Sequence, residues 1–241
     1  MDICKPMTTC DSVKKIAFGI SGYSRVDLDL VDNLNCLQNK QQIDFYVDCR
    51  EGANDWTDST NTQILQITNL CQQIEARYQE YKNLDILHDW PLVRGVLDHL
   101  LSLQHLAENL SASPCIQEYQ LIVFCHSRIR LTQPLDLLPM IPTGSLHFCN
   151  HLSRYCPNPM WMVVPPHQLH VIQGIVDKLY IWLQSQTQLD FPWGLVQGMP
   201  SKFNWGLILA QYFHDCGIIC HHNWYPLRII HHPVMWANKS P

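Results

Sequence analysis

The sequence predicts an α/β protein with one mostly parallel central sheet and helices on both faces of that sheet. Short apolar runs alternate with segments of helical periodicity over the first 120 residues, which is the pattern that βαβ units produce. The run 121–125 is unbroken, apolar and rich in β-favouring residues. Such a run is typical of a strand that is buried on both faces at the centre of a parallel sheet. We therefore expect the sheet to be organised around residues 121–125.

Size and charge favour one globular domain that does not bind nucleic acid. The 241 residues, 46% of them hydrophobic, are enough for one large core, and we expect a single domain over 1–241 with 1–13 as a loose lead-in. The formal net charge is −5, and the Lys and Arg residues are scattered. They do not form the basic stripe expected of a nucleic-acid-binding protein.

The cysteines and the lack of long apolar segments predict a cytoplasmic protein. The chain has 11 cysteines, an odd number in a large chain, and Cys71, Cys125 and Cys149 lie within apolar runs. We expect most of them to be reduced core residues. The N-terminus lacks the apolar region of a signal peptide. No run approaches the roughly 18 apolar residues that a transmembrane helix needs.

In the first half of the chain we expect strands at 15–20 and 43–47. From Thr60 onward a helix is predicted by apolar residues at alternating spacings of three and four, namely Ile64, Ile67, Cys71, Ile74 and Tyr78. A second helix follows Asp89, a favourable N-cap. Its predicted buried face is formed by Leu92, Val96, Leu100, Leu103, Leu106 and Leu110.

In the second half we expect short strands at 146–149 and 160–164. Pro165 and Pro166 open a helix whose predicted apolar face consists of Leu169, Ile172, Val176, Leu179 and Leu183. Another helix is predicted at 203–215, ended by Gly217. Short strands at 218–220 and 227–230 complete the chain.

The candidate ligand-binding residues are polar residues and a glycine that follow the predicted strands 15–20, 43–47 and 121–125. In open α/β sheets, ligands bind outside the carboxyl ends of the strands. A glycine after the first strand also lets backbone N–H groups approach an anion closely. The candidates are Ser21, Gly22, Arg25, Asp48, His126 and Arg128. An ordinary turn after the first strand and a solvated carboxylate at Asp48 are the alternatives.

A group of histidines and cysteines near the C-terminus raises the question of zinc. Cys216 and Cys220 are followed by His231 and His232, a spacing close to that of structural zinc sites without matching one. A strand at 218–220 would direct neighbouring side chains to opposite faces. We therefore predict no metal site here, and a zinc-stabilised interaction protein is the alternative.

Four short motifs carry a resemblance to a known family. They are Lys15-Ile16-Ala17 through Ile20-Ser21-Gly22 to Arg25, then 43–48, then Ser102-Leu103 through Ala107 to Leu110, then 119–135. Together they resemble a glycosyltransferase-like family of the nucleotide-diphospho-sugar (GT-A) type, found in bacterial surface-polysaccharide clusters and large viruses. The resemblance covers about three quarters of the chain. It implies a GT-A-like fold, a nucleotide-sugar donor, a glycan or other hydroxyl acceptor, and a role in polysaccharide biosynthesis.

The chain departs from the family pattern at the position of the metal ligand. His126 stands where the family has an Arg, and Arg128 stands where it has the acidic residue that holds a divalent cation. Downstream, Asn158-Pro159 replaces an Asn-Asp pair. The resemblance implies manganese or magnesium, whereas this departure predicts a site that does not depend on either metal. Either Arg128 binds the diphosphate, or the protein is an inactive binding or scaffold protein. The catalytic base stays open among Asp136, Asp177, Asp190 and Asp215.

Overall fold

The computed structural model describes residues 15–21, 43–48, 62–65, 69–84, 93–127, 129–149, 158–186, 205–223 and 227–229. Its main sheet has seven strands in the order β3-β2-β1-β4-β7-β6-β8. Their bounds are β1 Lys15–Ser21, β2 Ile43–Asp48, β3 Thr62–Leu65, β4 Tyr119–His126, β6 Leu146–Cys149, β7 Asn158–Val164 and β8 Cys220–Asn223. Neighbouring strands are parallel except where β7 lies antiparallel to β4 and β6. The predicted mostly parallel sheet is confirmed.

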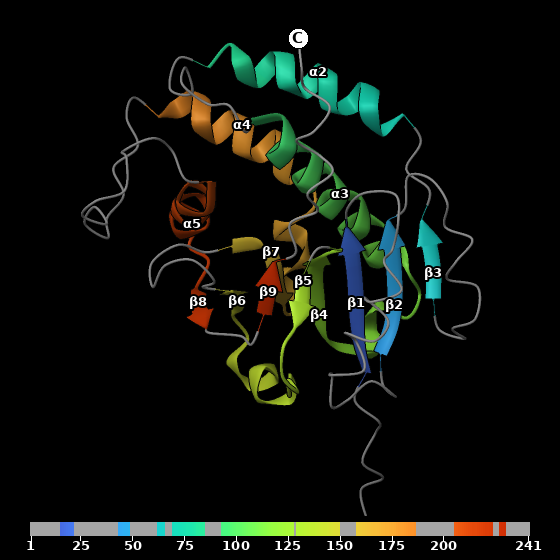
Figure 1. Cartoon of the computed structure of the whole chain (residues 1–241). Helices are drawn as coiled ribbons and strands as arrows, with labels where there is room; N and C mark the ends of the chain where they lie inside the picture. The colour runs from blue at the N-terminus through green and yellow to red at the C-terminus, as the bar shows by residue number, and fades with distance from the viewer. Residues whose placement is uncertain are drawn as a thin grey trace, which may run out of the picture.

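A second, two-stranded sheet pairs β5 with β9 in antiparallel fashion. Their bounds are Ile129–Leu131 for β5 and Leu227–Ile229 for β9. The α-helices are α2 Leu70–Lys82, α3 Val93–Ala112, α4 Ile175–Ser185 and α5 Trp205–Asp215, and the 3-10 helices are η4 Ile116–Glu118, η5 Leu138–Thr143 and η6 Pro166–Val171. Figure 1 shows α3 and α4 over the sheet, with α2 farther out.

The sheet has a hydrophobic core on each face. One core joins residues such as Ala17 and Phe124 to the apolar sides of α2, α3, α4, α5 and η6. The other joins residues such as Phe18 and Val123 to β5, and Met140 of η5 packs against it. Helices therefore lie on both faces, the α-helices on one and the 3-10 helix η5 on the other.

The central strand is β4, as the sequence predicts. Val123 is fully buried, and the strand has β1 on one side and β7 on the other. Apolar side chains on both faces of β4 allow it to contribute to both cores at once.

Small residues on β1 allow α3 to pack directly against the sheet. Ala17, Gly19 and Ser21 alternate along β1 and so share the face toward the α-helices. A Cβ atom on Gly19 would lie 2.8 Å from Cδ1 of Phe124 and 3.7 Å from Cδ1 of Leu106 in α3. The absence of a side chain at Gly19 thus leaves room for the ring of Phe124 from β4, and the distance to Leu106 shows that α3 lies directly over this part of β1.

The predicted helix from Thr60 begins later than expected. Residues Thr62–Leu65 form β3, which pairs in parallel with β2, and α2 begins only at Leu70 after Asn69 in a left-handed conformation with φ 60°. The exposed edge of β2 offers hydrogen bonds to the short apolar segment, and this pairing overrides its helical spacing. Cys71 is exposed rather than part of the core, because α2 buries the face of Leu70 and Ile74.

Two glycines define the helices of the second half. The 3-10 helix η6 ends at Val171, and Gly174, with φ 63°, immediately precedes α4, so the single helix predicted after Pro165 is divided in two. The five apolar residues predicted for its buried face are all buried. Gly217, with φ 73°, follows the end of α5 as predicted. The next strand, β8, begins at Cys220, later than expected.

Candidate functional site

The strand order reverses between β1 and β4. From β1 the chain adds β2 and then β3 on one side, whereas β4 pairs with the other side of β1. The carboxyl ends of β1 and β4 therefore flank a topological switch point, where open α/β sheets bind their ligands. Ser21 and His126 end these two strands and are register partners.

Three of the predicted site residues form a row across adjacent strand ends. Asp48 ends β2 and follows Val47, the register partner of Ile20 in β1. By strand alternation Asp48, Ser21 and His126 all lie on the face of the sheet that packs against the α-helices. We call Asp48, Ser21 and His126 the strand-end row.

A fourth polar residue reaches this row from α3. The Nδ1 atom of His99 lies 3.1 Å from Oγ of Ser21, within hydrogen-bond distance. The His99 ring lies 5.3 Å from the ring of His126 at an interplanar angle of 51°. The backbone N–H of Ser127 donates a 2.7 Å hydrogen bond to the carbonyl of Ser21. The two strand ends are thus joined by backbone as well as by side chains.

The strand-end row and His99 form a polar and largely buried cluster. Ser21, Asp48 and His99 are 0%, 2% and 9% exposed, whereas His126 and Ser127 are half-buried. Burying polar groups is costly unless they form hydrogen bonds, so a polar cluster at a strand end indicates a specific role. An alcohol, two imidazoles and a carboxylate can donate and accept hydrogen bonds and can transfer protons.

His99 is not among the residues predicted from the sequence, although a signal for it exists. His99 falls on the same helical stripe as Leu103, Leu106 and Leu110, spaced by four, three and four residues. A histidine on an otherwise apolar stripe is a buried polar residue that needs a partner.

The other predicted binding residues, Gly22, Arg25 and Arg128, lie outside the described residues. His231 and His232, two of the four candidate zinc ligands, also lie outside the described residues. Cys216 and Cys220 are free thiols, and burial raises the pKa of Cys220 to about 12. Within the described ranges, no three His, Cys, Asp or Glu residues are arranged to hold a metal ion.

A second histidine pair lies elsewhere in the sheet, on β6 and β8. His147 and His221 are register partners, with rings stacked 5.1 Å apart. Nε2 of His147 lies 2.7 Å from Oγ1 of Thr143. Burial, together with the neighbouring His221, lowers the pKa of His147 to about 4. Strand β7 separates this pair from β4 and the strand-end row.

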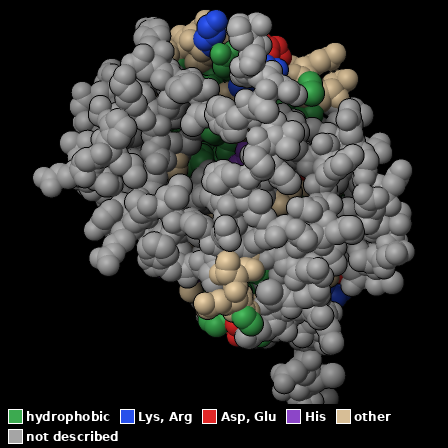
Figure 2. Space-filling model, in the orientation of Figure 1, with side chains coloured by type: hydrophobic (Ala, Val, Ile, Leu, Met, Phe, Trp, Pro, Cys, Tyr) green, Lys and Arg blue, Asp and Glu red, His purple; other side chains and the backbone are tan. Residues whose placement is uncertain are grey.

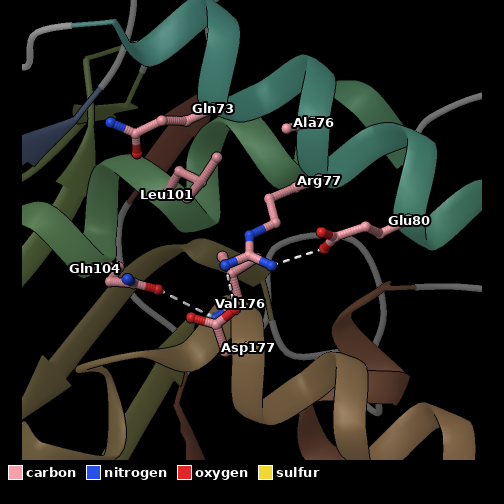
Figure 3. Close-up of a pocket in the computed structure, with 8 residues that line it drawn as sticks. All are labelled: Gln73, Ala76, Arg77, Glu80, Leu101, Gln104, Val176 and Asp177. Carbon is pink, nitrogen blue, oxygen red and sulfur yellow. Dashed lines mark hydrogen bonds and ion pairs between the residues drawn. The ribbon is translucent and has the colours of Figure 1, made fainter.

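A pocket of about 320 Å³ lies between α2, α3 and α4 (Figure 3). Arg77 extends into it and forms ion pairs with Glu80, at 2.7 Å, and with Asp177. Oε1 of Gln104 accepts a 3.3 Å hydrogen bond from the backbone N–H of Val176. These contacts connect three helices, and the charge of Arg77 is already balanced by two carboxylates. We interpret the pocket as part of the helix packing.

The candidate bases in the described residues have contacts of their own. Asp136 accepts a 3.0 Å hydrogen bond from the backbone N–H of Leu138, and Asp177 pairs with Arg77. Asp215 accepts a 2.6 Å hydrogen bond from Gln211. Asp190 lies outside the described residues. None of the three described carboxylates is part of the strand-end row.

On the face in Figure 2, described Lys and Arg side chains appear as small separate patches and form no continuous basic surface. Among the helices that the structure describes, none has the length and apolar character needed to cross a bilayer.

No protein-family model and no curated protein matches the chain, but solved structures do. The apo form of the glycosyltransferase GlyE from Streptococcus pneumoniae TIGR4 is 10% identical over 86% of this chain, with a TM-score of 0.40. An active-site mutant of LgtC is 11% identical over 73% of this chain and 66% of its own, with a TM-score of 0.43. Mouse xyloside xylosyltransferase 1 is 6% identical over 87% of this chain and 84% of its own, with a TM-score of 0.43.

The aligned region spans only 45% of the GlyE chain. At these identities and scores, the activity of the present chain has to be inferred from its own residues.

Proposed function

We propose that residues 1–241 form one glycosyltransferase-like domain that binds a nucleotide-sugar and transfers the sugar to a hydroxyl of a glycan or other acceptor. The observation that carries the proposal is the strand-end row of Asp48, Ser21 and His126 at the switch point between β1 and β4. This is the position at which open α/β sheets bind nucleotides. The free thiols of the described cysteines support the cytoplasmic location that we include in the proposal.

We further propose that binding does not depend on a divalent metal. The position where the resembled family holds its metal is occupied by Arg128, whose side chain lies outside the described residues. A guanidinium can bind two phosphate oxygens at once and carries a permanent positive charge. Hydrogen bonds to charged groups contribute about 1.5–3 kcal/mol.

Calorimetric titration with nucleoside diphosphates, in EDTA and in manganese, tests this proposal. Wild type should bind one of them with equal affinity in both buffers. Arg128→Ala should weaken that affinity by about 10- to 100-fold. Arg128→Asp should bind more weakly still in EDTA and regain part of the loss in manganese, because a carboxylate can again hold the cation.

Arg94→Ala is the matched control, since the side chain of Arg94 is exposed on α3 and forms an ion pair with Glu75 of α2. It should bind like wild type. If Arg128→Ala binds as tightly as wild type, Arg128 is not part of the site. If EDTA abolishes wild-type binding, the metal-independent mechanism is wrong.

An assay of enzymatic turnover distinguishes a transferase from a binding or scaffold protein with the same fold. Once the bound nucleotide is known, the matching nucleotide-sugars are incubated with a mixture of glycan acceptors. Acceptor-dependent release of the nucleoside diphosphate is expected of the transferase. Tight binding without acceptor-dependent release would favour the binding protein.

A further inference from the structure

We propose that His99 is a positioning residue that holds the ends of β1 and β4 in the geometry that receives the diphosphate of the donor, an inference that rests on the function proposed above. His99 differs from the strand-end row because it belongs to α3. Its ring contacts both strands, through Ser21 and through His126. A helix is thereby tied to the two strand ends of the switch point.

The position of the His99 ring is itself determined by packing. The residue is 9% exposed, and Leu103 and Leu106, which follow it on the same stripe of α3, are fully buried. Helix α3 lies directly over β1, because a Cβ on Gly19 would be only 3.7 Å from Cδ1 of Leu106. A ring held in this way has few alternative rotamers, so its hydrogen bond to Ser21 is preorganised.

The hydrogen bond between His99 and Ser21 also helps to fix the backbone of Ser127, the residue that follows β4. The carbonyl of Ser21 accepts a 2.7 Å hydrogen bond from the backbone N–H of Ser127, and the hydroxyl of Ser21 lies within hydrogen-bond distance of His99. Fixing Ser21 therefore also fixes the peptide of Ser127, the residue between His126 and Arg128. Packing alone would be served as well by leucine at position 99, without the cost of burying an imidazole. The hydrogen bond with Ser21 thus explains why position 99 holds a histidine rather than an apolar residue.

Two substitutions separate the hydrogen bond from the packing. His99→Asn places an amide nitrogen near the position of Nδ1, whereas His99→Leu keeps much of the volume without a polar atom. Ser21→Ala removes the same hydrogen bond from the other side. Ser102→Ala is the control, because Ser102 is 1% exposed on the same helix and its Oγ has no hydrogen-bond partner among the described residues.

The first readout needs no ligand. Native-state hydrogen exchange compares the Ser127 amide with that of Val123 in the centre of β4. We expect His99→Leu and Ser21→Ala to raise the exchange rate of Ser127 up to about tenfold relative to Val123, given the usual strength of one hydrogen bond. His99→Asn should stay within about threefold of wild type, and Ser102→Ala should match it.

The second readout is the calorimetric titration with the nucleoside diphosphate that wild type binds. His99→Leu should weaken binding up to about tenfold and His99→Asn should restore most of it. If Ser127 and Val123 accelerate together in both His99→Leu and Ser21→Ala, His99 is only structural and the inference is wrong. It is also wrong if His99→Leu binds like wild type. If exchange behaves as expected but wild type binds no nucleoside diphosphate, His99 positions the strand ends and the proposed function fails.

Discussion

Replacing Gly19 with alanine tests the close packing of the Phe124 ring over β1, in the core between the sheet and α3. The new Cβ would lie 2.8 Å from Cδ1 and 3.0 Å from Cε1 of Phe124. Both distances are well below the contact distance of about 3.5–4.0 Å between carbon atoms. Phe124 is fully buried in the core of the helix-covered face, so its ring cannot move without displacing neighbours.

The size of the effect follows from two opposing terms. Overpacking a well-packed core costs about 1–3 kcal/mol. Alanine recovers about 0.5–1 kcal/mol because it loses less backbone freedom than glycine when the strand forms. We therefore expect Gly19→Ala to lower the free energy of unfolding by about 1–2 kcal/mol. For a chain of this size, each kcal/mol corresponds to about 2–4 °C in Tm.

Gly95 provides the matched control on α3. A Cβ on Gly95 would have no neighbour within 4 Å, and the residue is exposed. Gly95→Ala should raise the free energy of unfolding by up to about 1 kcal/mol, because alanine favours the helix. The assay is urea denaturation followed by circular dichroism, with midpoints compared at equal slope. A midpoint for Gly19→Ala at or above that of wild type would refute the described packing of Phe124 over Gly19.

Two further predictions use the same denaturation assay. His147 has a pKa of about 4, below its ordinary value of 6.5, so the unfolded chain takes up a proton before the folded chain does. Stability should therefore fall by about 2–3 kcal/mol between pH 6.5 and pH 4, and His147→Gln should reduce this loss whereas the exposed His170→Gln should not. Tyr81→Phe removes a buried 2.6 Å hydrogen bond to the carbonyl of Val176 and should cost about 1–2 kcal/mol. An unchanged midpoint for Tyr81→Phe would show that this hydrogen bond contributes nothing to stability.

The elements predicted most accurately were those with strong local signals. The unbroken apolar run of β4 and the glycine after α5 each determine the local structure directly. Residues Thr62–Leu65 were assigned to a helix because their apolar residues fit the spacing of the helix that follows. Their strand conformation depends on pairing with β2, a segment about 15 residues earlier in the chain. A sequence pattern contains no direct information about such a partner.

The same distinction explains the candidate site. That Ser21, Asp48 and His126 follow strands is visible in the sequence, because each comes directly after an apolar run. That all three lie on one face depends on where each strand ends relative to its neighbours, and a shift of one residue would move Asp48 to the opposite face. The contact with His99 also requires α3 to lie against β1, and the two residues in contact, Ser21 and His99, are 78 residues apart in the sequence. The edge at which Ser21, Asp48 and His126 lie was therefore predictable, whereas the contact of His99 with this edge follows only from the register of the strands and the packing of a distant helix.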